Sequence, residues 1–118
     1  MLLNSSDLAY LLDIHECCLE IISFTKGIKY YHFERNKMAI RAVERSLGII
    51  GEASNKLSSE TRDQLPHIPW RKIIGLRNRI VHEYRDIIIF RTWEIAKKDI
   101  PVLFKQLKKI EQLKKFID

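Results

Sequence analysis

The sequence predicts an all-α fold, an up-and-down bundle of four to five helices. Apolar residues recur at intervals of three and four positions through most of the chain, which is the spacing of one helix face. Only four glycines and three prolines occur among the 118 residues, and no stretch alternates as a strand would. A hydrophobic content of 46% is enough for one core. We therefore expect residues 1–118 to form a single helical domain.

The first predicted helix runs from about Asp7 to Thr25, and Gly27 follows as a stop signal. Its apolar stripe comprises Leu8, Leu11, Leu12, His15, Cys18, Leu19 and Ile22. Cys17 and Cys18 are adjacent within this helix, so a disulfide between them would be strained, which favours a reducing compartment. No export signal and no apolar run of roughly 20 residues is present. We expect a cytoplasmic protein without a membrane span.

A second helix should begin near Phe33, with an inward face made by Ile40, Val43, Leu47, Ile50 and Leu57. Gly48 and Gly51 cost helix propensity, so we expect them to mark a close crossing with another helix. The stretch Ser58–Ile68 holds serine, aspartate and proline and predicts a loop, with one helical turn beginning at Ser59.

Pro69 predicts the start of a third helix, Trp70–Tyr84, because proline suits a first helical position. A short break should follow near Arg85–Ile88. Pro101 then marks either a kink or a new first turn in the last helical stretch. We expect both tryptophans of the chain to be core residues and not surfaces for base stacking.

The third helix places a charged side chain along its apolar face. On a helical wheel, six of its residues fall within roughly 60° of Arg77: Trp70, Ile73, Ile74, Ile80, Val81 and Tyr84. An unpaired guanidinium in apolar surroundings costs several kcal/mol, so Arg77 needs a carboxylate, a phosphate or an opening at a subunit boundary. Glu44 and Glu52 of the second helix are the candidate carboxylates.

Two further polar side chains adjoin this arginine. Asn78 and His82 lie one turn apart on the neighbouring face, and Gly75 leaves space there for a second subunit or a substrate. Arginine suits the bidentate geometry of a phosphodiester, and histidine suits proton transfer near pH 7. The net charge of +6 also suits a polyanionic partner. Together these features favour a site for RNA.

This series of residues resembles the signature of HEPN ribonucleases, specifically the HepT subfamily: Arg77, Asn78, His82 and Tyr84. Residues 50–53, 68–70, 73–75, 93 and 99–101 resemble the subfamily in order and spacing. The resemblance implies a HEPN-like bundle that dimerises so that the motifs of two subunits face a shared cleft. It also implies RNA cleavage without a metal ion or another cofactor.

The resemblance further implies a role for each motif residue. Arg77 would bind the scissile phosphate, His82 would handle the proton of the attacking 2'-hydroxyl or of the leaving oxygen, and Asn78 would orient the histidine or contact the phosphate. Glu52 would be a supporting residue. Many relatives have glycine immediately before the motif tyrosine, whereas this chain has Glu83, which we expect to face solvent and have little effect.

In the HepT subfamily, an MNT-type nucleotidyltransferase antitoxin typically silences the toxin by attaching AMP to the motif tyrosine, which corresponds to Tyr84. The resemblance therefore implies an endoribonuclease toxin of a type VII-like toxin-antitoxin pair. The assembly expected is a homodimer, or a larger hetero-oligomer with the antitoxin.

Two other interpretations remain open at the level of sequence. The chain could be a non-catalytic regulatory module that binds a nucleotide or RNA through the same side chains. Alternatively, it could be a structural dimer in which Arg77 only pairs with Glu44 or Glu52. Cleavage of RNA that depends on Arg77 and His82 in folded protein separates the enzyme from both alternatives.

Overall fold

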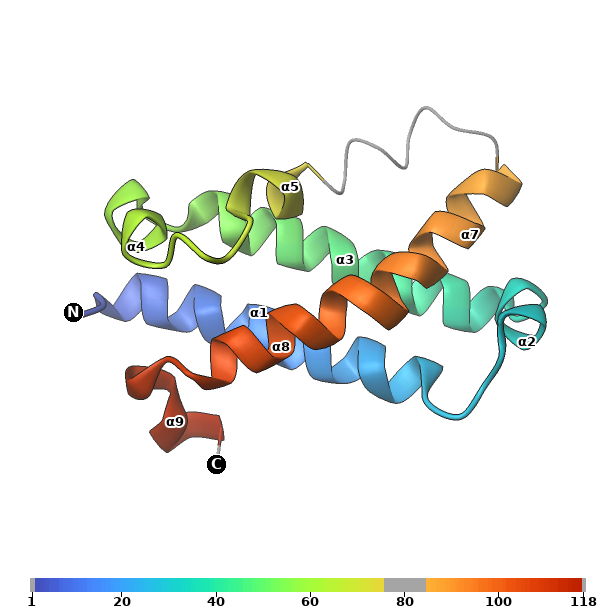
Figure 1. Ribbon diagram of the computed structural model, residues 1–118, viewed down its shortest axis with the longest axis horizontal. Helices are drawn as coiled ribbons and strands as arrows, with labels where there is room; N and C mark the ends of the chain where they lie inside the picture. The colour runs from blue at the N-terminus through green and yellow to red at the C-terminus, as the bar shows by residue number, and fades with distance from the viewer. Residues whose placement is uncertain (1, 76–84, 118) are drawn as a thin grey trace.

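The computed structural model describes residues 2–75 and 85–117, and every regular element in these two ranges is helical (Figure 1). In chain order the elements are α1 (Ser5–Thr25), α2 (Tyr30–Glu34), α3 (Lys37–Lys56), α4 (Ser59–Gln64), α5 (Trp70–Ile74), α7 (Arg85–Glu94), the π-helical segment η1 (Ile95–Asp99), α8 (Ile100–Lys108) and α9 (Glu111–Ile117). The predicted all-α class is confirmed. Within the described ranges, no helix has the length and apolar character of a membrane span.

The centre of the molecule is a pair of long helices, α1 and α3, that lie side by side in opposite directions (Figure 1). The continuous run of α7, η1 and α8 crosses this pair and closes the core. The largest fully buried side chains include Leu11, Ile14 and Ile21 of α1, Val43, Leu47 and Ile50 of α3, and Ile100 and Leu107 of α8. The predicted inward face of the second helix is confirmed, because all five of its residues are buried.

Side-chain caps explain where the longer helices begin. The Asn4 Oδ1 accepts a hydrogen bond from the Asp7 backbone N–H (2.7 Å), so α1 starts at Ser5, two residues before the predicted start. The Asn36 Oδ1 accepts one from the Ala39 N–H (3.0 Å) at the start of α3. At its other end α1 stops before Gly27, which has a φ of 74°.

The prediction of one helix beginning near Phe33 is wrong. Phe33 belongs to the short helix α2, and the long helix α3 begins only at Lys37. Asn36 separates the two, because as the N-cap of α3 it takes an extended conformation with φ −110° and ψ 91°. Phe33 itself is fully buried, which is how α2 is fixed to the bundle.

The predicted break near Arg85–Ile88 is also wrong, because α7 is helical from Arg85 onward. This stretch contains no glycine or proline to end a helix. Pro101 lies in the first turn of α8, directly after the π-helical segment η1. There the Ile100 N–H donates to the Ile95 carbonyl, five residues back, and this wider turn accommodates a proline that has no N–H of its own.

Candidate functional site

The four motif residues predicted from the sequence, Arg77, Asn78, His82 and Tyr84, lie outside the described residues, as does Glu83. What the structure describes is the frame around them. The motif follows α5 and Gly75 on one side and precedes α7 on the other. Each part of this frame is held to the bundle in a different way.

The N-terminal side of the frame is α5, which is anchored by the buried side chains of Trp70 and Ile73 and by one close backbone approach. Trp70 is 7% exposed, and its Nε1 donates a hydrogen bond to the Leu65 carbonyl (3.1 Å). A Cβ added at Gly51 of α3 would lie 3.5 Å from the Ile73 carbonyl oxygen and 3.7 Å from that of Ile74. The predicted close crossing therefore occurs at Gly51, and the buried position predicted for Trp70 is confirmed.

Gly48 and Gly75 differ from Gly51. No described atom lies within 4 Å of the Cβ position at Gly48, so within the described part of the chain it marks no close crossing. At Gly75 the Cβ position meets the carbonyl oxygens of Arg71 and Lys72, at 3.4 and 3.6 Å, which belong to its own turn. The approach of a second subunit or a substrate at Gly75 stays a prediction, because the described atoms at this position belong to the same helical turn.

The C-terminal side of the frame is α7, which packs on α2 and α3. Ile88 and Thr92 are buried, and Trp93 packs on the Phe33 ring with 5.1 Å between centroids. Phe90 meets the Tyr30 ring edge to face at 5.2 Å. Trp93 is partly buried against the core, as predicted.

A buried carboxylate, which sequence reasoning missed, ties the start of α4 to the start of α1. Asp7 is 2% exposed and accepts hydrogen bonds from the Ser58 N–H (3.1 Å), the Ser58 hydroxyl (2.6 Å), the Thr61 hydroxyl and the Asn4 amide (3.2 Å). Burial by itself would raise the pKa of Asp7, but these hydrogen bonds outweigh it and hold the pKa below its ordinary value. The predicted turn at Ser59 is confirmed as α4, and the Asp7 network fixes its position.

A broad hollow of about 980 Å³ opens between α4, the following loop and α5. Arg62, Arg71 and Lys72 line it together with one carboxylate, Asp63. Gly75, which directly precedes residues 76–84, is also in the lining. Among the described residues of the lining, three cations accompany one anion, a balance suited to a polyanion such as RNA.

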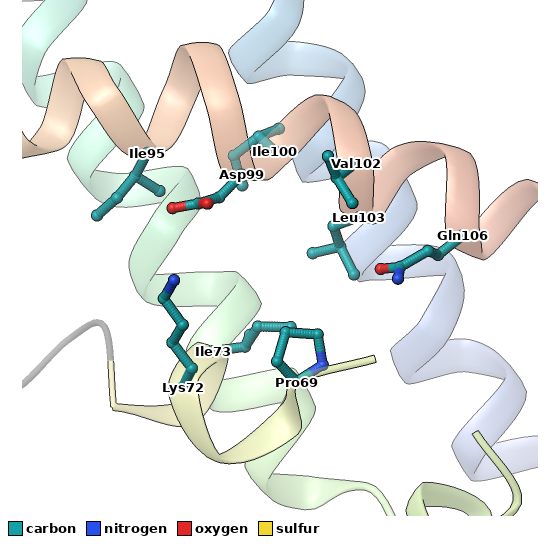
Figure 2. A pocket seen from close by; sticks show the side chains of 9 residues that line it. All are labelled: Pro69, Lys72, Ile73, Ile95, Asp99, Ile100, Val102, Leu103 and Gln106. Carbon is teal, nitrogen blue, oxygen red and sulfur yellow. The ribbon is translucent and has the colours of Figure 1, made fainter. Parts of the chain in front are cut away.

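A smaller apolar pocket of about 120 Å³ lies between α5 and the η1–α8 segment (Figure 2). Ile73, Ile100 and Leu103 are among its apolar lining residues, and Figure 2 shows the Lys72 ammonium of α5 pointing toward the Asp99 carboxylate of η1. Apolar walls offer no hydrogen bonds to phosphate oxygens. This pocket is therefore a poorer place for the RNA backbone than the basic hollow.

The candidate carboxylate partners of Arg77 both belong to α3. Glu44 lies 3.7 Å from the Arg41 guanidinium and its side chain is 14% exposed. Glu52 is on the exposed surface of the helix. Within the described residues, no three histidine, cysteine, aspartate or glutamate side chains are grouped so that they could hold a metal ion.

The two cysteines are poor candidates for a nucleophile. Both are free thiols and both are buried inside α1. Burial raises the pKa of Cys17 to about 11 and that of Cys18 to about 12. Since the thiolate is the reactive form, neither side chain is activated at neutral pH.

Comparison with known proteins gives the family. The family described as Ribonuclease HepT-like matches residues 14–110, which include the whole motif and both helices of its frame. The chain belongs to the HepT-like ribonuclease family. The resemblance predicted from the motif is thereby confirmed.

Two relatives illustrate how far the similarity to HepT-like proteins extends. "Putative RNase MJ1380" of Methanocaldococcus jannaschii is 42% identical over 99 residues, which cover 84% of this chain and 91% of the relative. "Probable ribonuclease HepT" of Thermococcus cleftensis is 35% identical over 103 residues, covering 87% and 94%. No solved structure matches the chain. Asp7 and α9 lie outside the residues matched by the HepT-like family.

Proposed function

We propose that this protein is a metal-independent endoribonuclease whose reaction is carried out by Arg77 and His82. The observation that carries the proposal is the match to a ribonuclease family across residues 14–110, which include both side chains. The basic hollow beside the motif adds physical support, because it offers three cations to an RNA backbone at the point where the motif begins.

The proposed reaction needs a phosphate clamp and a proton carrier. The 2'-oxygen of a ribose attacks the adjacent phosphorus, a bond from phosphorus to the 2'-oxygen forms, and the bond to the 5'-oxygen of the next nucleotide breaks. Arg77 binds the non-bridging phosphate oxygens and stabilises the negative charge that develops on them. His82 accepts the 2'-hydroxyl proton or donates a proton to the leaving 5'-oxygen, and Asn78 orients the imidazole or contacts the phosphate.

The proposed assembly is a homodimer in which the motifs of two subunits face one cleft. Two copies would supply two histidines, so that one imidazole accepts a proton while the other donates one. Glu52 of α3 is the proposed supporting carboxylate near Arg77. An RNA strand in this cleft would reach the basic hollows of both subunits, since the lining of each hollow includes Gly75, two residues before Arg77 in the sequence.

The proposed regulation is transfer of AMP to Tyr84 by an MNT-type nucleotidyltransferase antitoxin. The phenol oxygen of Tyr84 would attack the α-phosphorus of ATP, and pyrophosphate would leave with its bonding electrons. The added nucleotide would place a bulky anion two residues from His82 and block entry of RNA. Intact-mass spectrometry after co-expression should find added AMP on the wild type and none at this position in Tyr84→Phe.

The deciding experiment measures cleavage of single-stranded RNA in the presence of EDTA. Wild-type protein should cut, while Arg77→Ala and His82→Ala should lose roughly a hundredfold or more of the rate, as expected when a charge clamp or a general acid-base group is removed. Arg41→Ala and His67→Ala are matched controls, because both residues are exposed and lie outside the motif. Equal rates in all five proteins would reject the proposed active site.

The same measurement separates the enzyme from a binding module. If Arg77→Ala weakens RNA binding but no protein yields a cleavage product, the chain is a regulatory module that uses the motif for binding alone. If Arg77→Ala instead lowers stability and leaves binding and cleavage unchanged, the arginine has only a structural role.

A further inference from the structure

A group of aromatic and basic side chains covers the corner where α2 packs on α7. We call this group the α2–α7 patch, and it comprises Lys29, Tyr30, Tyr31, His32, Arg35, Ile89 and Phe90. In Figure 1 this corner lies at the end of the molecule opposite the two chain termini. None of these side chains takes part in the proposed reaction.

The patch presents aromatic rings that are exposed and yet held in place. Tyr31 is 54% exposed and Phe90 is 46% exposed. The Tyr31 ring packs beside that of His32 with 4.0 Å between centroids, and the Phe90 ring is fixed edge to face on Tyr30. Large apolar rings left partly in water on a small bundle are available to stack on a ligand.

The charge around these rings is strongly positive. Between positions 26 and 37 only one exposed carboxylate, Glu34, faces four exposed cations: Lys26, Lys29, Arg35 and Lys37. The Arg35 guanidinium lies 5.8 Å from the centre of the Tyr31 ring and donates to the Tyr31 carbonyl at 2.9 Å. Its pair with Glu34 at 3.2 Å is exposed and therefore weak. A cation is thus held over the same ring that is open to stacking.

The patch also contains a concave place. Tyr30, Glu34, Arg35 and Ile89 line a hollow of about 240 Å³ between α2 and α7. Its wall combines an aromatic ring and an aliphatic side chain with a guanidinium and the exposed carboxylate of Glu34 that pairs with it. This combination can receive the flat apolar face of a base and a neighbouring phosphate together.

The position of the patch along the chain links it to the motif. Arg85, the first residue of α7, is bonded to Tyr84, and Phe90 follows five residues later on the same helix. At a rise of 1.5 Å per residue, Phe90 is about 7.5 Å along the axis from Arg85. The exposed rings are therefore carried by the helix that leads directly out of the motif.

We propose that the α2–α7 patch is a binding subsite for single-stranded RNA, in which unpaired bases stack on Tyr31 and Phe90 and phosphates contact Arg35 and Lys29. The proposal rests on the proposed ribonuclease function for the identity of the natural ligand. RNA is favoured over a protein partner because stacking rings beside an excess of cations are what sequence-tolerant single-strand binding requires.

The test measures binding of fluorescently labelled oligoadenylate in the His82→Ala background, so that RNA is not consumed. The double substitution Tyr31→Ala/Arg35→Ala should raise the Kd roughly tenfold, the loss expected for one stacked base. It should also lower the slope of log K against log salt by about 0.7, which corresponds to one phosphate contact on a single strand. Tyr31→Phe keeps the ring and should bind as tightly as the parent protein.

The chain offers a closely matched control in α9. Phe116 is also 54% exposed, and the Lys115 ammonium lies 5.3 Å from its ring centre. Lys115→Ala/Phe116→Ala therefore removes one exposed ring and one charge at the end of the molecule away from α2. Its Kd and salt slope should stay within about twofold of the parent, because it removes no proposed RNA contact. Both double variants lose one positive charge, so a difference between them is not caused by net charge alone.

The outcomes separate the subsite from the enzyme. Equal Kd values for the two double variants would overturn the subsite, even if the wild type cuts RNA. A selective loss of affinity at Tyr31 and Arg35 would support the subsite even if the wild type cuts nothing, in which case only the proposed reaction fails. If the patch variant binds RNA normally but no longer associates with a co-expressed nucleotidyltransferase, the patch is a protein docking surface and the RNA proposal is wrong.

Thermal melts should show that both double variants stay folded, since all four substituted side chains are exposed.

Discussion

The two helices that frame the motif are held by contacts of different kinds. α5 has five residues and is held by two buried side chains, Trp70 and Ile73, and by the approach of its backbone to Gly51. α7 has ten residues, and aromatic contacts to α2 are spread along it. A short helix held by a few contacts responds strongly to the loss of one of them, whereas a longer helix has other contacts that remain. The N-terminal side of the frame should therefore be the more fragile.

Replacing Trp70 should give the largest effect on stability. Trp70→Ala removes a buried indole and its hydrogen bond to the Leu65 carbonyl, so the free energy of unfolding should fall by about 3–5 kcal/mol. Trp93→Ala on the other side of the frame should cost less, because that ring is only partly buried and its neighbours Phe33 and Tyr30 remain. Urea denaturation measures both losses. Equal losses of unfolding free energy in the two variants would show that the N-terminal side of the frame is not the more fragile.

The Asp7 network predicts an acid dependence that affects the same side of the frame. Because the pKa of Asp7 is lower in the folded protein than in the unfolded chain, its contribution is complete above the unfolded pKa of about 3.9 and disappears as the pH falls through the lower folded pKa. Asp7→Asn should lower the free energy of unfolding at pH 7 by about 1.5–3 kcal/mol, the usual contribution of a hydrogen bond to a charged group.

The Asp7 substitution should also flatten the acid limb of the stability curve. Denaturation between pH 3 and pH 7 measures the curve, with Asp13→Asn, an exposed aspartate on the same helix, as the control. Hydrogen exchange should speed up in α4 before it does in α2, because Asp7 bonds to Ser58 and Thr61 and to no residue of α2 that the structure describes. An unchanged acid limb in Asp7→Asn would show that other carboxylates set it.

Local patterns in the sequence predicted much of the fold. The predicted apolar face of α3 is confirmed, because burying such a face is what places a helix in a bundle. The predicted stripe of α1 is only partly right: Leu11, His15 and Cys18 are buried, but Leu19 is 47% exposed, and the buried face also includes Ile14, Cys17 and Ile21. Features set by tertiary contacts were missed. Asp7 accepts hydrogen bonds from residues 51 and 54 positions away, and no pattern near Asp7 in the sequence predicts these partners. The separation of α2 from α3 was missed for a different reason, because the N-cap that causes it, Asn36, is a local signal that the sequence analysis did not use.

For the candidate site, too, features set by local sequence could be predicted and features set by tertiary contacts could not. The motif spacing predicted the HepT-like family, which the comparison with known proteins confirms, since spacing along the sequence is a local property. The basic hollow could not be predicted, because Arg62 and Arg71 are brought together only when the loop between α4 and α5 folds back. The roles of Arg77 and His82 stay predictions, because those residues lie outside the described part of the chain.

The smallest expected effect concerns the two glycines of α3, and it sharpens what holds α5. Glycine inside a helix is about 0.5–1 kcal/mol less stable than alanine. Gly48→Ala should gain about this much, because no described atom lies within 4 Å of the new methyl group. At Gly51 the methyl would meet the carbonyls of α5 at 3.5 and 3.7 Å, which is ordinary contact, so Gly51→Ala should be stabilising too.

Gly51→Leu, in contrast, should push α5 outward and lower the free energy of unfolding by about 1–3 kcal/mol, whereas Gly48→Leu should not. Thermal denaturation of the four variants shows whether the crossing at Gly51 accepts the methyl group of alanine but not the larger side chain of leucine. If both leucine variants are as stable as the wild type, Gly51 does not fix α5, and the N-terminal side of the frame depends on the buried side chains of Trp70 and Ile73.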